Sequence, residues 1–194
     1  MIRKQILIGL VLAAGFLFFG AHITQAATYT WDGGGDKVTW TDCKNWAEFG
    51  ASCTGANAYP GATTTDDIVI QTQTGGGDIT VRATSSLPNI GSVTLGGAGG
   101  TGGGPTLIIG NGISFIASTT VSVIGTSTLK LGDSTWGSAI LYLENGVNNA
   151  TPLSIGANAS FVAATGTAVF NGDKGGVDDI NILVATTTYY NLTF

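Results

Sequence analysis

The stretch that decides the fold is VSVIGTSTLKLG, residues 121–132. It holds two short runs in which apolar residues alternate with Ser or Lys, and a Gly closes each run. Alternation with a period of two is typical of a half-buried β-strand, because successive side chains of a strand point to opposite faces. The glycines favour tight corners, since Gly readily adopts left-handed backbone. The stretch therefore predicts two short strands separated by a corner.

The same arrangement recurs along most of the chain, as in Val93-Thr94-Leu95-Gly96 and Leu153-Ser154-Ile155-Gly156. Residues that favour helices are scarce, whereas Val, Ile, Thr, Tyr and Phe dominate between Gly-rich turns, which indicates strands. Short strands are predicted at 67–70, 79–81, 92–95, 106–109, 113–116, 120–123, 128–131, 140–143, 153–155, 161–163, 168–170, 180–183 and 190–193.

These patterns predict an all-β fold, a right-handed parallel β-solenoid (β-helix) with an N-terminal Trp-rich cap. The repeated motif has one shape, its polar positions are Thr, Ser and Asn residues that can stack in ladders, and its corners favour Gly and Asn. A β-sandwich is the alternative, because it also consists of short strands with frequent turns and because the spacing of the motif is irregular.

Residues 1–26 have the three parts of a secretory signal peptide. Arg3 and Lys4 precede an uncharged apolar run over 6–19, and Thr24-Gln25-Ala26 ends in small residues, which predicts cleavage after Ala26. The predicted location is therefore secreted or at the cell surface. The chain has no other long apolar run, so we expect membrane contact only through the signal peptide or through a missing C-terminal region.

Removal of this segment takes away His22, the one histidine, together with Arg3 and Lys4. Five basic residues then remain against 12 acidic ones, a formal net charge of −7. Such an acidic chain with scattered lysines argues against binding to nucleic acid. Without histidine, Ser-His-Asp and Cys-His sites are excluded, so no catalytic residue and no enzyme activity are predicted.

Cys43 and Cys53 are the only cysteines, and a lone pair in an exported chain usually forms a disulfide. The short loop predicts a stabilisation of roughly 2–3 kcal/mol. The alternative is a metal-binding pair, but no histidine or third cysteine is present to complete it. No metal site and no cofactor are therefore predicted, and the acidic, Gly-rich turns that could hold Ca²⁺ are interpreted as ordinary turns.

The acidic pairs Asp66-Asp67 and Asp178-Asp179 could in principle serve a glycosidase. Neighbouring residues of a strand point to opposite faces, so neither pair forms a dyad by itself. We interpret both pairs as charges at strand edges.

The region from 27 to 65 is predicted to be a capping segment that carries the disulfide loop, and 66–194 the solenoid repeats. Trp31, Trp40 and Trp46 are expected to plug the first coil, with their indole N–H groups bonded to partners such as Asp42 or Asn45. The rival interpretation of these three tryptophans is a platform on which a sugar stacks.

The pattern of this region, with Trp-x-Gly-Gly at 31–34, Trp-x-Asp-x-x-Asn-Trp at 40–46 and an Asp-rich strand start at 66–70, resembles the opening of repeat-rich bacterial surface proteins. These are the autotransporter-associated β-strand-repeat proteins and the adhesin-like or S-layer-like β-helix proteins. The resemblance implies surface display and a role in adhesion or structure. The Cys43–Cys53 loop departs from the family's pattern.

We therefore expect a non-enzymatic extracellular segment with a structural or adhesive role, truncated at its C-terminus, whose partners are carbohydrate or other surface proteins, including copies of itself. Alternatives are a carbohydrate-binding module, a polysaccharide-active β-helix enzyme and a small outer-membrane β-barrel. The barrel is suggested by the alternation of Tyr190, Leu192 and Phe194, although the strands are short for it.

Overall fold

The fold is that of a computed structural model, which describes residues 26–50, 53, 58–62, 65–71, 78–85, 87–97, 103–144, 151–170 and 191–193. It is all-β, apart from one 3-10 helix, η1 (Cys43–Asn45). The strands are β1 (Thr28–Thr30), β2 (Asp66–Ile70), β3 (Thr80–Ala83), β4 (Leu87–Leu95), β5 (Thr106–Ile109), β6 (Ser114–Ala117), β7 (Val121–Val123), β8 (Thr128–Leu131), β9 (Ile140–Leu143), β10 (Leu153–Ile155), β11 (Ser160–Val162), β12 (Thr167–Phe170) and β13 (Asn191–Thr193).

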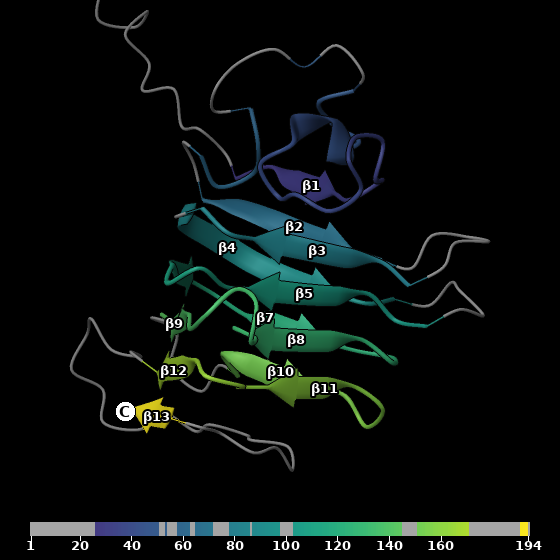
Figure 1. The fold of residues 1–194 in the computed structure, drawn as a ribbon. Helices are drawn as coiled ribbons and strands as arrows, with labels where there is room; N and C mark the ends of the chain where they lie inside the picture. Colours follow the sequence, from purple (N-terminus) through teal and green to yellow (C-terminus); the bar gives the residue numbers. More distant parts are fainter. Residues whose placement is uncertain are drawn as a thin grey trace, which may run out of the picture.

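Two sheets contain these strands, and every pairing between them is parallel. The larger sheet has nine strands, in the order β1-β2-β4-β6-β9-β12-β13, with β7 and β10 on a branch that starts from β4. The smaller sheet has the order β11-β8-β5-β3. Figure 1 shows the strands stacked one above another, from β1 near one end to β13 at the other. A β-sandwich is excluded, because its sheets are antiparallel.

The chain moves between the two sheets in a repeating order. A strand of the smaller sheet is followed by one or two strands of the larger sheet, and the chain then returns to the smaller one. Strand β4 is long enough to take part in both branches: Leu87 and Ile90 pair with β6, and Val93–Leu95 pair with β7. The strands consequently form three columns, one in the smaller sheet and two in the larger.

Within each column, equivalent residues lie directly beside one another. In the smaller sheet Val81 pairs with Leu107, Leu107 with Leu129 and Leu129 with Phe161, and all four side chains are buried. Their neighbours along each strand are mostly more accessible, as alternation in a strand requires. The buried apolar residues of all three columns form one continuous hydrophobic cluster between the sheets.

Glycines make the corners between strands, as the sequence predicts, and two of them cannot be replaced freely. Gly96 has φ +98° and Gly132 has φ +75°, both in the left-handed region. A Cβ at Gly132 would lie 2.1 Å from the carbonyl oxygen of Gly137, and one at Gly96 would lie 2.3 Å from that of Ile124. Asn111, at another corner, also has a positive φ, which Asn tolerates better than most residues.

Three tryptophans pack together beside β1 and β2. The ring of Trp46 meets those of Trp31 and Trp40 edge to face, at centroid distances of 5.0 and 4.9 Å. Trp40 also meets Phe115 edge to face at 5.7 Å, which joins this cluster to the core between the sheets. For Trp40 and Trp46, the indole partners predicted from the sequence are wrong. Backbone carbonyls accept instead: Pro60 accepts from Trp40 and Trp40 accepts from Trp46.

Asn45 and Asp42 stabilise the turns around the tryptophans rather than the indoles. The Asn45 side-chain oxygen accepts the backbone N–H groups of Gly35 and Lys37, and its amide donates to Asp36 and to the Thr39 carbonyl. Asn45 is fully buried, so these bonds satisfy a polar group that would otherwise be costly to bury.

The disulfide predicted between Cys43 and Cys53 is present, with 6.1 Å between the Cα atoms. Such a bond is typical of an oxidising, extracytoplasmic environment. In the part of the chain that the structure describes, no helix has the length and apolar character required to cross a membrane. The predicted signal peptide falls almost entirely in 1–25, outside the described residues.

Most predicted strands are present within one or two residues of their expected ends, for example at 106–109, 128–131, 140–143 and 153–155. Two strand segments were not predicted: β1 and the first half of β4. The latter contains Pro88, which lowers the strand propensity of the segment. The predicted strand at 180–183 lies outside the described residues.

Candidate functional site

A column of hydroxyl side chains runs across the outer face of the smaller sheet. Thr80 pairs with Thr106, Thr106 with Thr128 and Thr128 with Ser160, each one strand apart. The three threonines are partly exposed and the serine is exposed. Neighbouring strands are about 4.8 Å apart, so the hydroxyls form a regular row of donors and acceptors.

A second column lies two residues further along the same strands and on the same face. It consists of Arg82, Ile108, Lys130 and Val162 in successive register positions. Two of its four members are cations, although the whole chain carries a formal net charge of −5. Ile108 lies between the cations and is only 7% exposed, despite its outward position.

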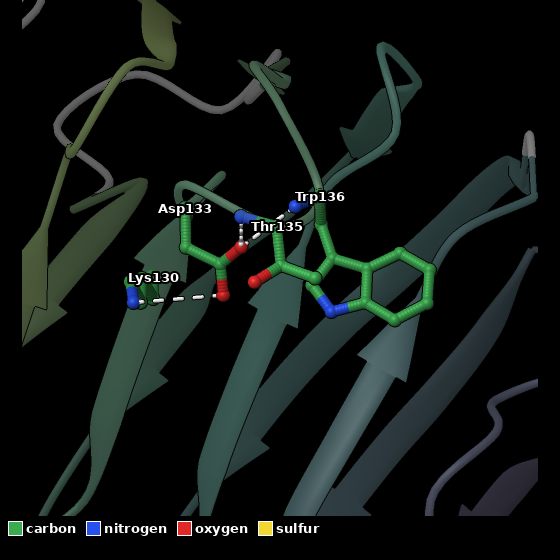
Figure 2. Close-up of polar contacts among 4 residues, drawn as sticks. All are labelled: Lys130, Asp133, Thr135 and Trp136. Atoms are coloured by element: carbon green, nitrogen blue, oxygen red, sulfur yellow. Dashed lines mark hydrogen bonds and ion pairs between the residues drawn. The ribbon is translucent and has the colours of Figure 1, made fainter.

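The loop that follows β8 places a fourth tryptophan, Trp136, beside this column. Figure 2 shows how the Asp133 carboxylate holds the loop: one oxygen accepts the backbone N–H groups of Thr135 and Trp136, at 2.8 and 2.7 Å. The other oxygen lies 3.7 Å from the Lys130 ammonium. Asp133 and Gly137 also exchange two backbone hydrogen bonds. The loop is therefore anchored at its base and at the peptide N–H of Trp136.

The charge of Asp133 is favoured by the same contacts. The pKa of its carboxyl is lowered, first by the hydrogen bond from the Trp136 N–H, then by that from Thr135 and by the nearby Lys130. The carboxylate consequently remains charged well into the acidic range, and the loop keeps its geometry at neutral pH.

Trp136 packs against Gly110 and contacts a cation. A Cβ at Gly110 would lie 2.8 Å from the Trp136 Cβ, so the glycine leaves room for the tryptophan. The Trp136 carbonyl accepts the N–H of Asn111. The Arg82 guanidinium carbon lies 5.6 Å from the centroid of the indole, within the range of a cation–π contact. Trp136 itself is partly exposed.

The three tryptophans singled out in the sequence do not offer a ring to a sugar. Trp31 is 3% exposed, and Trp40 and Trp46 are fully buried. Trp136 is the accessible one, and it is not among the site residues predicted from the sequence. Its position in the sequence could have indicated an exposed ring. Trp136 is the only tryptophan outside 31–46, and it lies in the polar turn Asp133-Ser134-Thr135-Trp136-Gly137.

The acidic pair at the start of β2 has structural partners. Asp66 is 3% exposed and accepts the Gly61 N–H, whereas Asp67 accepts the N–H and hydroxyl of Ser92. The two carboxylates thus serve different donors, as opposite strand faces require, but they are not simple edge charges. Asp178-Asp179 lies outside the described residues. Among the described residues, no three His, Cys, Asp or Glu side chains gather into a group that could hold a metal ion.

Comparisons with protein-family models, with curated proteins and with solved structures found no match to this chain. The resemblance to repeat-rich bacterial surface proteins therefore depends on the motifs at 31–46 and 66–70 and on the repeated strands.

Proposed function

We propose that this chain is a right-handed parallel β-solenoid, capped at its N-terminus, that acts as a non-enzymatic adhesive segment of an extracytoplasmic surface protein. Its outer face would bind an extended polymer through many weak contacts of the same kind. Three features support this function: the three columns of strands, the hydroxyl column and the disulfide.

Three columns of parallel strands, visited in a fixed order, support the solenoid. Along the smaller sheet, the successive partners Thr80, Thr106, Thr128 and Ser160 are separated by 26, 22 and 32 residues. Each separation is the length of one coil in this interpretation, and the variation is taken up by loops at the corners. The strands can therefore stack regularly even though the sequence motif recurs at irregular intervals.

A capping role for the N-terminal segment is supported by what lies beside β1. The Ala47 N–H donates to the Thr30 carbonyl at 2.9 Å, and the Glu48 carboxylate accepts the Thr30 N–H at 2.8 Å. These bonds occupy the N–H and the carbonyl of Thr30, which face away from β2. An unoccupied edge would recruit strands from other molecules, which a terminal cap prevents.

The observation that carries the adhesive function is the hydroxyl column of Thr80, Thr106, Thr128 and Ser160. Buried aliphatic residues on the same strands hold it rigid, so little conformational entropy is lost when a partner binds. Each hydroxyl both donates and accepts a hydrogen bond, which suits a partner rich in hydroxyls, such as a polysaccharide. A repeated row also allows avidity from individually weak contacts.

Export is supported by the disulfide and by the pattern of residues 1–26. The full chain, expressed in a bacterium with its own N-terminal segment, is expected in the exported fraction with Ala27 as its first residue and no free thiol. Mass spectrometry of the purified protein measures both. Recovery of uncleaved, reduced chain from the cytoplasm would contradict the proposed location.

The adhesive role is tested with the exported protein, by cosedimentation with cellulose, chitin and calcium-gelled polygalacturonate. The variant T106V/T128V removes two hydroxyls of the column but keeps side-chain shape and strand propensity. The control variant T94V/T167V makes the same change at partly exposed positions of the larger sheet. We expect binding to at least one polymer, weakened about fivefold or more in T106V/T128V and unchanged in the control.

Thermal melting checks that both variants fold. If no polymer binds the wild-type protein, or if the two variants bind alike, the proposed adhesive face is wrong.

A further inference from the structure

We propose that Arg82 and Trp136 form a subsite for a carboxylate-bearing sugar, so that the polymer recognised by the smaller sheet is an acidic polysaccharide. This inference rests on the proposed adhesive function and names its ligand class. The key observation is a guanidinium and an accessible indole held together beside the hydroxyl column.

Arg82 is the cation available to a ligand. Lys130, two strands away, lies 3.7 Å from the Asp133 carboxylate, but no carboxylate of the described residues is within ion-pair distance of Arg82. The Arg82 Nε is also buried without a hydrogen-bond partner in the described part of the chain. Among the described residues, no acceptor thus engages this guanidinium, and because Arg82 is partly exposed, an anion brought by a ligand can bind its accessible donors.

The chemistry of the guanidinium selects the anion. Its planar fork matches a carboxylate in a two-point contact, and such charge-assisted hydrogen bonds are about twice as strong as neutral ones. The contact with Trp136 orients the fork in advance. Carboxylates occur on sugars as uronic acids, which places the charge and the hydroxyls on one molecule.

Trp136 supplies the complementary contact for the sugar ring. A pyranose presents a face of C–H groups that packs on an aromatic ring, and an indole provides a large, rigid surface for it. The backbone of Trp136 is held in place because its peptide N–H donates to Asp133 and its carbonyl accepts from Asn111, and the ring contacts the Arg82 guanidinium. A platform fixed in this way loses little entropy on binding.

The subsite and the hydroxyl column lie on one continuous face. Arg82 is two residues from Thr80 on β3, and both side chains alternate with the buried Val81. A polysaccharide that crosses the strands can therefore place its carboxylate near Arg82 and its hydroxyls along the threonines.

The test compares soluble polygalacturonate with its fully methyl-esterified form, which has the same sugar without the charge. Binding to the exported protein is measured by affinity electrophoresis and calorimetry. We expect the acid form to bind about tenfold or more tightly than the ester, with affinity that decreases as salt rises. R82Q should remove this preference, and R82K should restore only part of it, because an ammonium lacks the fork.

W136A should weaken both polymers by about tenfold. The control K44Q makes the same change of charge as R82Q at an exposed position of η1, away from the smaller sheet, and should bind like the wild type. Thermal melting of every variant separates loss of binding from loss of folding.

Each outcome is informative. Equal binding of acid and ester, still sensitive to T106V/T128V, would overturn the acidic subsite and leave the adhesive function in place. Preference for the acid that depends on Arg82 but not on the two threonines would support the subsite and overturn the hydroxyl column. No binding to either polymer, by a protein that also fails with cellulose and chitin, would overturn both.

Discussion

Single carboxylates organise the turns of this protein, and Asp36 is the clearest case. One of its oxygens accepts the backbone N–H groups of Val38 and Thr39, and the Asn45 amide donates to the same atom. Burial alone would raise the pKa of Asp36, but the hydrogen bonds from Thr39, Val38 and Asn45 outweigh it and lower the pKa to about 2. The turn therefore depends on a charged side chain that protonates only in strong acid.

The sign of the pH effect follows from this lowered pKa. A group whose pKa is lower in the folded protein than the ordinary 3.8 stabilises the fold above about pH 4, and this stabilisation is lost as the pH falls towards 2. We expect D36N to unfold about 1 kcal/mol more easily at pH 7, because a neutral acceptor bonds the same donors less strongly.

Denaturant unfolding of both proteins at several pH values measures this difference. The gap between wild type and D36N should shrink between pH 4 and pH 2, since the wild-type carboxyl becomes neutral there. A gap that stays constant over that range would contradict the role of the Asp36 charge.

Among the elements, β1 shows how the end of a stack of strands is protected. It pairs with β2 on one side, and on the other side Ala47 and Glu48 satisfy the backbone groups of Thr30. The smaller sheet, in contrast, presents a repeated pattern to a partner. Each of its strands β3, β5, β8 and β11 places a hydroxyl side chain at the same register position of the outer face.

Replacement of Glu48 by Ala should expose the edge of β1. The Thr30 N–H would lose its acceptor, which costs roughly 1 kcal/mol, and the strand could then pair with another molecule. Light scattering during incubation at high protein concentration should show faster association of E48A than of the wild type. The matched variant E144A removes a carboxylate from the end of β9 and should associate like the wild type. Equal rates for E48A and the wild type would indicate that Glu48 does not protect the edge.

At the scale of the whole molecule, the Trp cluster and the columns share one core. Phe115, which is 1% exposed, meets Trp40 on one side and belongs to β6 of the larger sheet. The N-terminal segment that holds the tryptophans and the two sheets are thus expected to unfold as one unit, because their buried side chains are in direct contact.

The variant F115A should lower the free energy of unfolding by about 3–5 kcal/mol, the usual cost of removing a buried phenyl ring. In proteins that also carry W136F, tryptophan fluorescence reports only on Trp31, Trp40 and Trp46, whereas far-UV circular dichroism reports on the strands. The two signals should still change together. A fluorescence transition that clearly precedes loss of the strands would show instead that the two parts unfold independently.

Much of this architecture is predictable from the sequence because period-two patterns and corner glycines are local signals. The strands at 106–109 and 128–131 follow directly from alternation, and the left-handed backbone at Gly96 and Gly132 was expected from the corner motif. Less predictable are β1 and the first half of β4, whose strand conformation depends on pairing with distant segments.

The sequence by itself determined the all-β class, the cysteine pairing and the residues that alternate between core and surface, since each depends on neighbours along the chain or on the only available partner. Only the tertiary structure decided which strands lie side by side, and hence that Arg82, Trp136 and the hydroxyl column share one face. Arg82 and Trp136 are 54 residues apart in the chain. Their contact arises from the stacking of successive strands, so it cannot be predicted from a pattern of neighbouring residues. The same stacking buries Trp31, Trp40 and Trp46, which the sequence alone left open as a sugar platform.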